Sequence, residues 1–149
     1  MSNLTAQKLF GAASIPILFS FALAGCVHQS TDITFIVPQG FRGEIRIWEE
    51  PDSPHAATRG ENTLTLRTFT LQIPASGELP LQETDLFFRW HTPILQFEGS
   101  DTVSRSDTAP TSPEEIKLFS SGSVAYDDGP QIHVFFVGTL EEFLASKRR

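Results

Sequence analysis

Residues 131–137 have the sequence QIHVFFV, in which apolar side chains occupy both alternating positions of an extended chain. Successive side chains of a β-strand point to opposite faces of the sheet, so this run predicts a strand that is covered on both faces. The turn signal DDGP at 127–130 precedes it, and Gly138 ends it. We therefore expect this strand to lie in the centre of a sheet.

Further strand candidates lie upstream, between residues 32 and 48. Residues 32–37 (DITFIV) are rich in β-branched side chains and stop at Pro38. Residues 44–48 (EIRIW) alternate, which places Ile45 and Ile47 on one face of the strand and the other side chains opposite. Because a Pro-Gln-Gly turn separates these two strands, they form either a β-hairpin or an arch between two sheets.

The middle of the chain predicts shorter and less regular elements. Residues 63–73 form the longest strand candidate, and their hydrophobic pattern changes parity, which indicates a bend or bulge near Arg67. Residues 85–91 alternate in part and predict a strand that carries Trp90 into the core. The remaining candidates are 94–97, 114–119 as strand or helical turn, and 120–126 as a weak strand, while 49–62 and 99–113 are expected to be surface loops.

Taken together, these short segments predict a mainly β fold, an antiparallel β-sandwich of about seven strands. A short helix over 140–145 closes the chain. Thr139 can cap its amino terminus, and Glu141 and Glu142 lie in its first turn, where the helix dipole favours negative charge.

Three short motifs together resemble those of an uncharacterised family of bacterial secreted and lipoprotein domains. They are FIVPQGFRG at 35–43, IPASG at 73–77, and FVGT at 136–139 followed by two glutamates. That family is similar to transthyretin-like or carboxypeptidase-regulatory-like sandwiches. The resemblance implies a sandwich fold and assigns no catalytic residue.

The overall composition limits the classes of partner. The chain of 149 residues has a formal net charge of −7. An acidic domain without a basic cluster in its body is poorly suited to nucleic acid, which is bound largely through Lys and Arg. Its thirteen phenylalanines and single tyrosine favour core packing over polar recognition.

Cys26 is the sole cysteine, which excludes an intramolecular disulfide and a multi-cysteine metal site. It follows a polar start with Lys8 and an apolar run over 9–24 that is short for a membrane span. The sequence LAGC at 23–26 resembles the lipobox of bacterial lipoprotein signal peptides. That resemblance implies cleavage after Gly25, a diacylglyceryl group on the Cys26 sulfur, and acylation of the new amino terminus by a fatty acid such as palmitate.

These features divide the chain into a leader (1–25), a lipidated tether (26–31) and a sandwich domain (32–149). Two or three acyl chains on one residue give stable anchoring, whereas a single chain binds membranes only marginally. Val27 stands where Asp would direct retention in the inner membrane. The resemblance therefore implies the cell envelope, and in a Gram-negative cell the periplasmic face of the outer membrane.

Motifs of catalysis are absent from the sequence: it contains no phosphate-binding glycine loop, no His-Glu-x-x-His and no Gly-x-Ser-x-Gly. His91 and His133 lie in expected strands and can meet in space, where Asp85 would complete a zinc site. Their spacing is not diagnostic. We expect no metal, no cofactor and no enzymatic activity.

Trp48 and Arg46 are the candidate ligand contacts, because both are expected on the outward face of one strand. The first functional hypothesis is a non-enzymatic interaction or structural module of the cell envelope, bound to membrane lipid through Cys26 and to an envelope protein or glycan. The alternative is a lipoprotein that binds a glycan or peptide ligand. A small envelope hydrolase is the third possibility.

The lipobox prediction is tested by the substitution Cys26→Ser. The lipobox resemblance implies that the Cys26 sulfur accepts the diacylglyceryl group and that cleavage occurs at this residue. We therefore expect the variant to lose both metabolic labelling with a radioactive fatty acid and leader cleavage. Labelling and the mass of the product are read by gel electrophoresis. A Cys26→Ser protein that still incorporates fatty acid would contradict the prediction.

Overall fold

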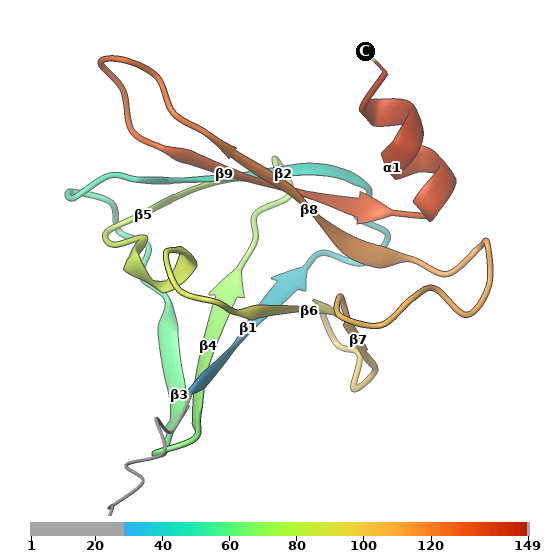
Figure 1. The fold of residues 1–149 in the computed structure, drawn as a ribbon, viewed down its shortest axis with the longest axis horizontal. Coiled ribbons are helices and arrows are strands. Elements are labelled where there is room, and N and C mark those ends of the chain that lie inside the picture. Colours follow the sequence, from blue (N-terminus) through green and yellow to red (C-terminus); the bar gives the residue numbers. More distant parts are fainter. Residues whose placement is uncertain (1–28, 149) are drawn as a thin grey trace, which may run out of the picture.

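The structure is a computed structural model and describes residues 29–148. These residues form nine strands, a 3-10 helix and one α-helix: β1 (Ser30–Val37), β2 (Gly43–Glu49), β3 (Thr58–Asn62), β4 (Leu66–Gln72), β5 (Glu78–Leu81), η1 (Asp85–Phe87), β6 (Thr92–Phe97), β7 (Val103–Arg105), β8 (Lys117–Val124), β9 (Ile132–Gly138) and α1 (Leu140–Ser146) (Figure 1). Gly25 and Cys26 lie outside the described residues, so cleavage and lipidation stay predictions. No helix in the described part of the chain is long and apolar enough to cross a membrane.

The strands form two sheets, with the orders β3-β4-β1-β6-β7 and β5-β2-β9-β8. Both sheets are mixed. β1 runs parallel to β4 and to β6, and β2 runs parallel to β5, while the other ladders are antiparallel. The prediction of a mainly β fold is confirmed, but the sheets are mixed and contain nine strands, where an antiparallel fold of about seven was expected. Alternation within a strand fixes which face is buried, but it carries no information on the direction of the neighbouring strand.

The connections between the parallel strands pass through the opposite sheet. After β1 the chain turns at 38–42 into β2 of the other sheet, so this connection is the arch and not the hairpin. It then returns through β3 to β4, crosses again to β5, and comes back through η1 to β6 (Figure 1). Parallel strands cannot be joined by a tight turn, and these crossings supply the longer path that they need.

Several strands expected from the sequence are confirmed. β1 and β2 cover the predicted segments, β9 is shifted by one residue to Ile132–Gly138, and β9 lies inside its sheet between β2 and β8. Ile45 and Ile47 are fully buried, as their parity predicted. β1 begins at Ser30, so the last two residues of the expected tether belong to the first strand.

Other expectations are corrected by the structure. β3 and β7 occupy segments that were expected to be surface loops, and β5 forms in a segment where no strand was expected. Residues 85–87 form the helical turn η1 instead of the start of a strand, and Phe87 is the side chain of this turn that is buried. Trp90 is 85% exposed and does not belong to the core. A helical turn changes the direction of each side chain, so a prediction from strand parity fails there.

The hydrophobic pattern of 63–73 changes parity because its first residues lie in the β3–β4 turn and only the later ones belong to β4. The irregularity lies in β3, between Arg59 and Asn62, and not in β4. Phe69 and Leu71 of β4 face the core, while Leu64 lies in the β3–β4 turn and is 86% exposed.

One hydrophobic core lies between the sheets. Its buried members come from both layers and are Ile33, Phe35, Val37, Ile45, Ile47, Leu71, Ile73, Leu79, Leu81, Phe87, Leu95, Leu118, Phe135 and Val137. At its centre, the Phe35 ring lies 4.7 Å from the Phe135 ring and 6.5 Å from the Phe87 ring. These separations are typical of stabilising aromatic pairs. The abundance of phenylalanine in the sequence is thus used in part to fill the space between the sheets.

The C-terminal helix begins as predicted. The Thr139 hydroxyl accepts a hydrogen bond from the Glu142 backbone N–H, and the Glu142 carboxylate accepts one from the Thr139 N–H, which completes a capping box. Phe143 of this helix stacks on Phe119 of β8 at 4.7 Å. This contact holds α1 against the outer face of the four-stranded sheet.

Gly77 offers a test of how closely the crossing between β4 and β5 packs. Its φ is +76°, and an added Cβ would overlap the Glu44 carbonyl oxygen of β2. Gly99 has a similar φ of +70° with open space around it. We expect Gly99→Ala to cost about 1–2 kcal/mol for the left-handed backbone alone. Gly77→Ala should cost about 1–3 kcal/mol more, because the clash adds to the same backbone strain.

Urea unfolding of the two variants measures this difference directly. Equal destabilisation by Gly77→Ala and Gly99→Ala would show that the turn before β5 does not approach the neighbouring strand β2 so closely.

Candidate functional site

The predicted ligand contacts Trp48 and Arg46 both lie on β2 and face away from the core. Arg46 is exposed and Trp48 is half-buried. Their alternation with the buried Ile45 and Ile47 confirms the predicted faces of this strand. That they contact a ligand stays a prediction.

Trp48 belongs to an apolar row that crosses all four strands of its sheet. Directly paired residues share a face, and Trp48 is paired with Pro80 of β5 on one side and with Ile132 of β9 on the other. Ile132 is paired in turn with Val124 of β8, which is 45% exposed. We call Pro80, Trp48, Ile132 and Val124 the outer row.

The row next to it is charged on β5 and β2 and apolar on β9 and β8. Arg46 lies between Glu78 of β5 and Val134 of β9, and its Nε donates a hydrogen bond to the Glu44 carboxylate at 2.5 Å. Glu44 raises the pKa of the Arg46 guanidinium through that hydrogen bond and through its charge, and Glu78 and Tyr126 add smaller contributions. Both partners of this ion pair are about half exposed, so it adds little to stability. The exposed side chains of Arg46 and Glu44 therefore provide hydrogen-bonding groups beside the outer row.

Helix α1 covers the far end of the same face. Phe143 packs against Phe119 and also lies 5.9 Å from Phe136 of β9. Lys147 lies over the Phe143 ring and donates a hydrogen bond to the Ser121 carbonyl oxygen. The helix therefore shields the phenylalanines of this face and leaves the outer row open.

His91 and His133 approach each other around Phe87. The His133 ring stacks on the Phe87 ring at 4.7 Å, and the His91 ring meets the same ring edge-on at 5.7 Å. Among residues 29–148, no three His, Cys, Asp or Glu side chains come together as metal ligands. His91 Nδ1 donates to the Arg89 carbonyl oxygen at 2.8 Å. His91 and His133 thus form an aromatic cluster with Phe87.

His133 is the most perturbed group of this cluster. It is 7% exposed, and its Nε2 has no hydrogen-bond partner in the described part of the chain. Burial lowers the pKa of the His133 imidazole, and the nearby His91 lowers it further. Both effects disfavour a positive charge, so His133 is neutral in the folded protein near neutral pH.

A cavity of about 390 Å³ opens at one end of the five-stranded sheet. Arg59, Arg67 and Arg89 line it, together with the carboxylates of Glu83 and Asp85. None of the three arginines forms an ion pair within residues 29–148. The Nε of Arg67 is buried without a hydrogen-bond partner. Sequence reasoning missed these arginines, because they are far apart along the chain and share no motif.

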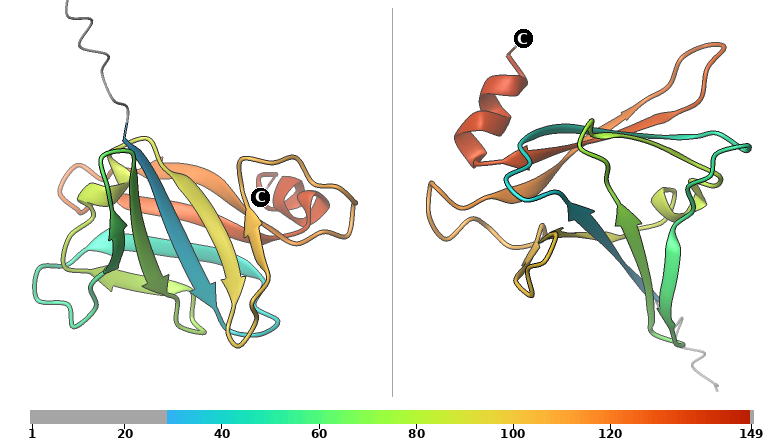
Figure 2. Two further views of the ribbon diagram at one scale, coloured as in Figure 1. Left: turned by 90° about the horizontal axis from the view of Figure 1, so that it is seen from below. Right: turned by 180° about the vertical axis from the view of Figure 1, so that it is seen from behind.

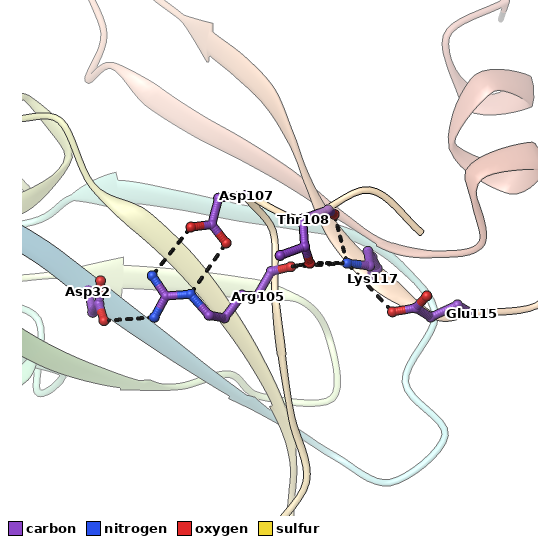
Figure 3. Close-up of polar contacts among 6 residues, drawn as sticks. All are labelled: Asp32, Arg105, Asp107, Thr108, Glu115 and Lys117. Atoms are coloured by element: carbon purple, nitrogen blue, oxygen red, sulfur yellow. Dashed lines mark hydrogen bonds and ion pairs between the residues drawn. The ribbon is translucent and has the colours of Figure 1, made fainter. Parts of the chain in front are cut away.

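The segment 99–113, expected to be a surface loop, is tied to the fold by two charged side chains. Arg105 of β7 forms ion pairs with Asp107 and, at 3.1 Å, with Asp32 of β1 (Figure 3). The hydrogen bonds of Asp107 and Asp32, in that order, raise the pKa of the Arg105 guanidinium. Lys117 of β8 is 3% exposed.

Lys117 closes the same segment from the other side. Its Nζ donates to the Arg105 carbonyl oxygen and to the carbonyl and hydroxyl oxygens of Thr108, at 2.7–3.1 Å. It also lies 3.5 Å from the Glu115 carboxylate (Figure 3). These contacts satisfy the hydrogen-bonding needs of the buried Lys117 ammonium group. Arg105 and Lys117 therefore have a structural role.

Comparison with known proteins gives little beyond this geometry. No protein-family model matches the chain, and no curated protein matches it. A crystal structure described as a "Putative Lipoprotein" from Bacillus anthracis aligns with a TM-score of 0.43 and 14% sequence identity, over 77% of each chain. A likeness at this level assigns neither a family nor a function to this chain.

The buried His133 predicts a pH dependence of stability. Its pKa is lower in the folded state than in the unfolded state, so below the ordinary imidazole pKa of about 6.5 the unfolded chain binds more protons. The unfolding free energy should therefore fall as the pH drops from about 7.5 to about 5. Urea unfolding across this range measures it.

The contribution of His133 is identified from the slope of unfolding free energy against pH, and not from the absolute stability of each variant. His133→Gln should remove most of the slope, whereas His55→Gln, at an exposed histidine, should leave it intact. A slope that survives His133→Gln would contradict the assignment.

Proposed function

We propose that this protein is a lipid-anchored, non-enzymatic β-sandwich module of the bacterial cell envelope, which binds a partner protein through the outer face of the β5-β2-β9-β8 sheet. The observation that carries the proposal is the outer row, an apolar line across all four strands that α1 leaves open.

The chemistry around the outer row supports a protein as the partner. Protein interfaces combine an apolar centre with a polar margin, and Trp, Tyr and Arg contribute most to their binding energy. Trp48 lies inside the row, the Arg46–Glu44 pair lies beside it, and Tyr126 is 59% exposed in the β8–β9 connection next to it. An apolar row on the open face of a sheet suits another protein surface better than a small molecule, which needs a concave site.

The anchor of the proposed module is Cys26. An acylated cysteine with two or three chains holds a protein stably at a membrane without spanning it. A fixed position at the membrane also raises the effective concentration of the module near an envelope partner, so a modest interface is sufficient. Val27 after the cysteine supports the outer membrane as the location in a Gram-negative cell.

The proposal is tested by site-specific photo-crosslinking in the native envelope. A photoreactive amino acid at Val124, in the outer row, should give a crosslinked product of defined mass. Trp48→Ala in the same background should reduce the yield about tenfold or more, because truncating an interface hot spot costs about 2 kcal/mol or more.

Val103 provides a matched control. It is a valine on an edge strand of the other sheet and is 53% exposed, similar to Val124. The same probe at Val103 should give no such product. Equal crosslinking from both positions, or a product from Val124 that is insensitive to Trp48→Ala, would refute the outer row as the binding face.

A further inference from the structure

The end of the five-stranded sheet at which β1 begins collects three segments. β1, β4 and β6 are parallel, with Ser30 paired to Leu66 and Asp32 paired to Thr92. Their amino-terminal ends therefore lie at the same end of the sheet. Figure 2 (left) shows the start of β1, the β3–β4 turn and the loop that leads into β6 along one edge of the molecule.

The two most exposed large hydrophobic side chains of the described residues lie in these segments. Leu64, in the β3–β4 turn, is 86% exposed, and Trp90, in the loop before β6, is 85% exposed. An isolated exposed Leu or Trp is ordinary on a protein surface. What distinguishes these two is that they occupy the end from which the chain leads back to Cys26.

The path to Cys26 is short and its end is fixed. The Gln29 side chain donates a hydrogen bond to the Thr63 carbonyl oxygen, and the Ser30 backbone N–H donates to the Thr65 carbonyl oxygen at 2.9 Å. The first described residues are thus held against the β3–β4 turn. Cys26 precedes Gln29 by three residues, which span about 10 Å when fully extended.

The charge of this end does not oppose contact with a membrane. The segments 59–67 and 83–91 carry three arginines and three carboxylates, whereas the whole chain has a net charge of −7. The arginines are Arg59, Arg67 and Arg89, which have no ion-pair partner within residues 29–148. Guanidinium groups bind phosphate well, and Trp favours the boundary between lipid and water.

We propose that this end faces the bilayer that holds Cys26, with Leu64 and Trp90 inserted into its interfacial layer. This inference rests on the lipid anchor of the proposed function. A protein held by about 10 Å of chain cannot keep this end far from the lipid. Burial of the two side chains removes apolar surface from water and fixes the orientation of the domain, which the acyl chains alone leave free.

The two tryptophans allow a direct test on the lipidated full-length product, reconstituted into vesicles of phosphatidylcholine and phosphatidylglycerol. In Trp48→Phe, Trp90 is the sole tryptophan; in Trp90→Phe, Trp48 is the sole tryptophan. Trp90 emission should shift to the blue and lose most of its intensity when the lipids carry bromine near the head of the acyl chain. Trp48, on the outer face of the other sheet, should show neither change.

Leu64→Ser should weaken the quenching of Trp90, because the two side chains insert together. If Trp48→Phe disturbs the fold, subtracting the Trp90→Phe emission from that of the unmodified protein yields the Trp90 signal without that substitution. Mass spectrometry of the acylated Cys26 peptide is recorded on each sample. Acylated, vesicle-bound protein with unquenched Trp90 would overturn this inference alone, whereas protein without acyl chains would overturn both the inference and the anchor.

Discussion

Strand β1 pairs in parallel with both of its neighbours, and the rest of the fold depends on this arrangement. A chain that leaves the far end of β1 has to travel back before it can form β4 or β6, and a tight turn cannot provide that path. The return runs through β2 the first time and through β5 the second time. The second sheet is thus built partly from the return paths of the first, which explains why both sheets are mixed and why they share one core.

Aromatic side chains from both sheets pack against each other at the centre of the core. Phe35 of β1 meets Phe135 of β9 and Phe87 of η1, so one ring cluster joins both sheets to the helical turn that connects them. His133 takes a place in this cluster as a neutral aromatic ring. Lys117 is buried at the edge of the structure, where carbonyl and hydroxyl oxygens surround its ammonium group (Figure 3). These oxygens offset the cost of burying the Lys117 ammonium group, and the centre of the core contains no charged side chain.

The same arrangement separates two surfaces. Parallel strands bring their amino-terminal ends together, and this places the β3–β4 turn, which carries Leu64, and the loop before β6, which carries Trp90, at the end of the sheet where β1 begins. The outer row with Trp48 lies on the opposite layer, on the face that points away from the core. The proposed anchor at Cys26 would hold the first of these surfaces near a membrane and leave the second free for the proposed partner. The outer row is apolar and has the Arg46–Glu44 ion pair beside it, in keeping with the apolar centre and polar margin of protein interfaces.

Local periodicity in the sequence determined β1, β2, β9 and the capped helix α1, because the burial of alternating side chains and the capping of a helix are properties of adjacent residues. It also placed Trp48 and Arg46 on one outward face. β3 and β7 have too little apolar pattern to be recognised before a neighbour pairs with them, and β5 is only four residues long and contains Pro80 between its two buried leucines. The tertiary structure alone decided the direction of pairing, the exposure of Trp90, and the meeting of Arg59, Arg67 and Arg89 in one cavity. These depend on contacts between residues far apart in the chain, which no local pattern encodes.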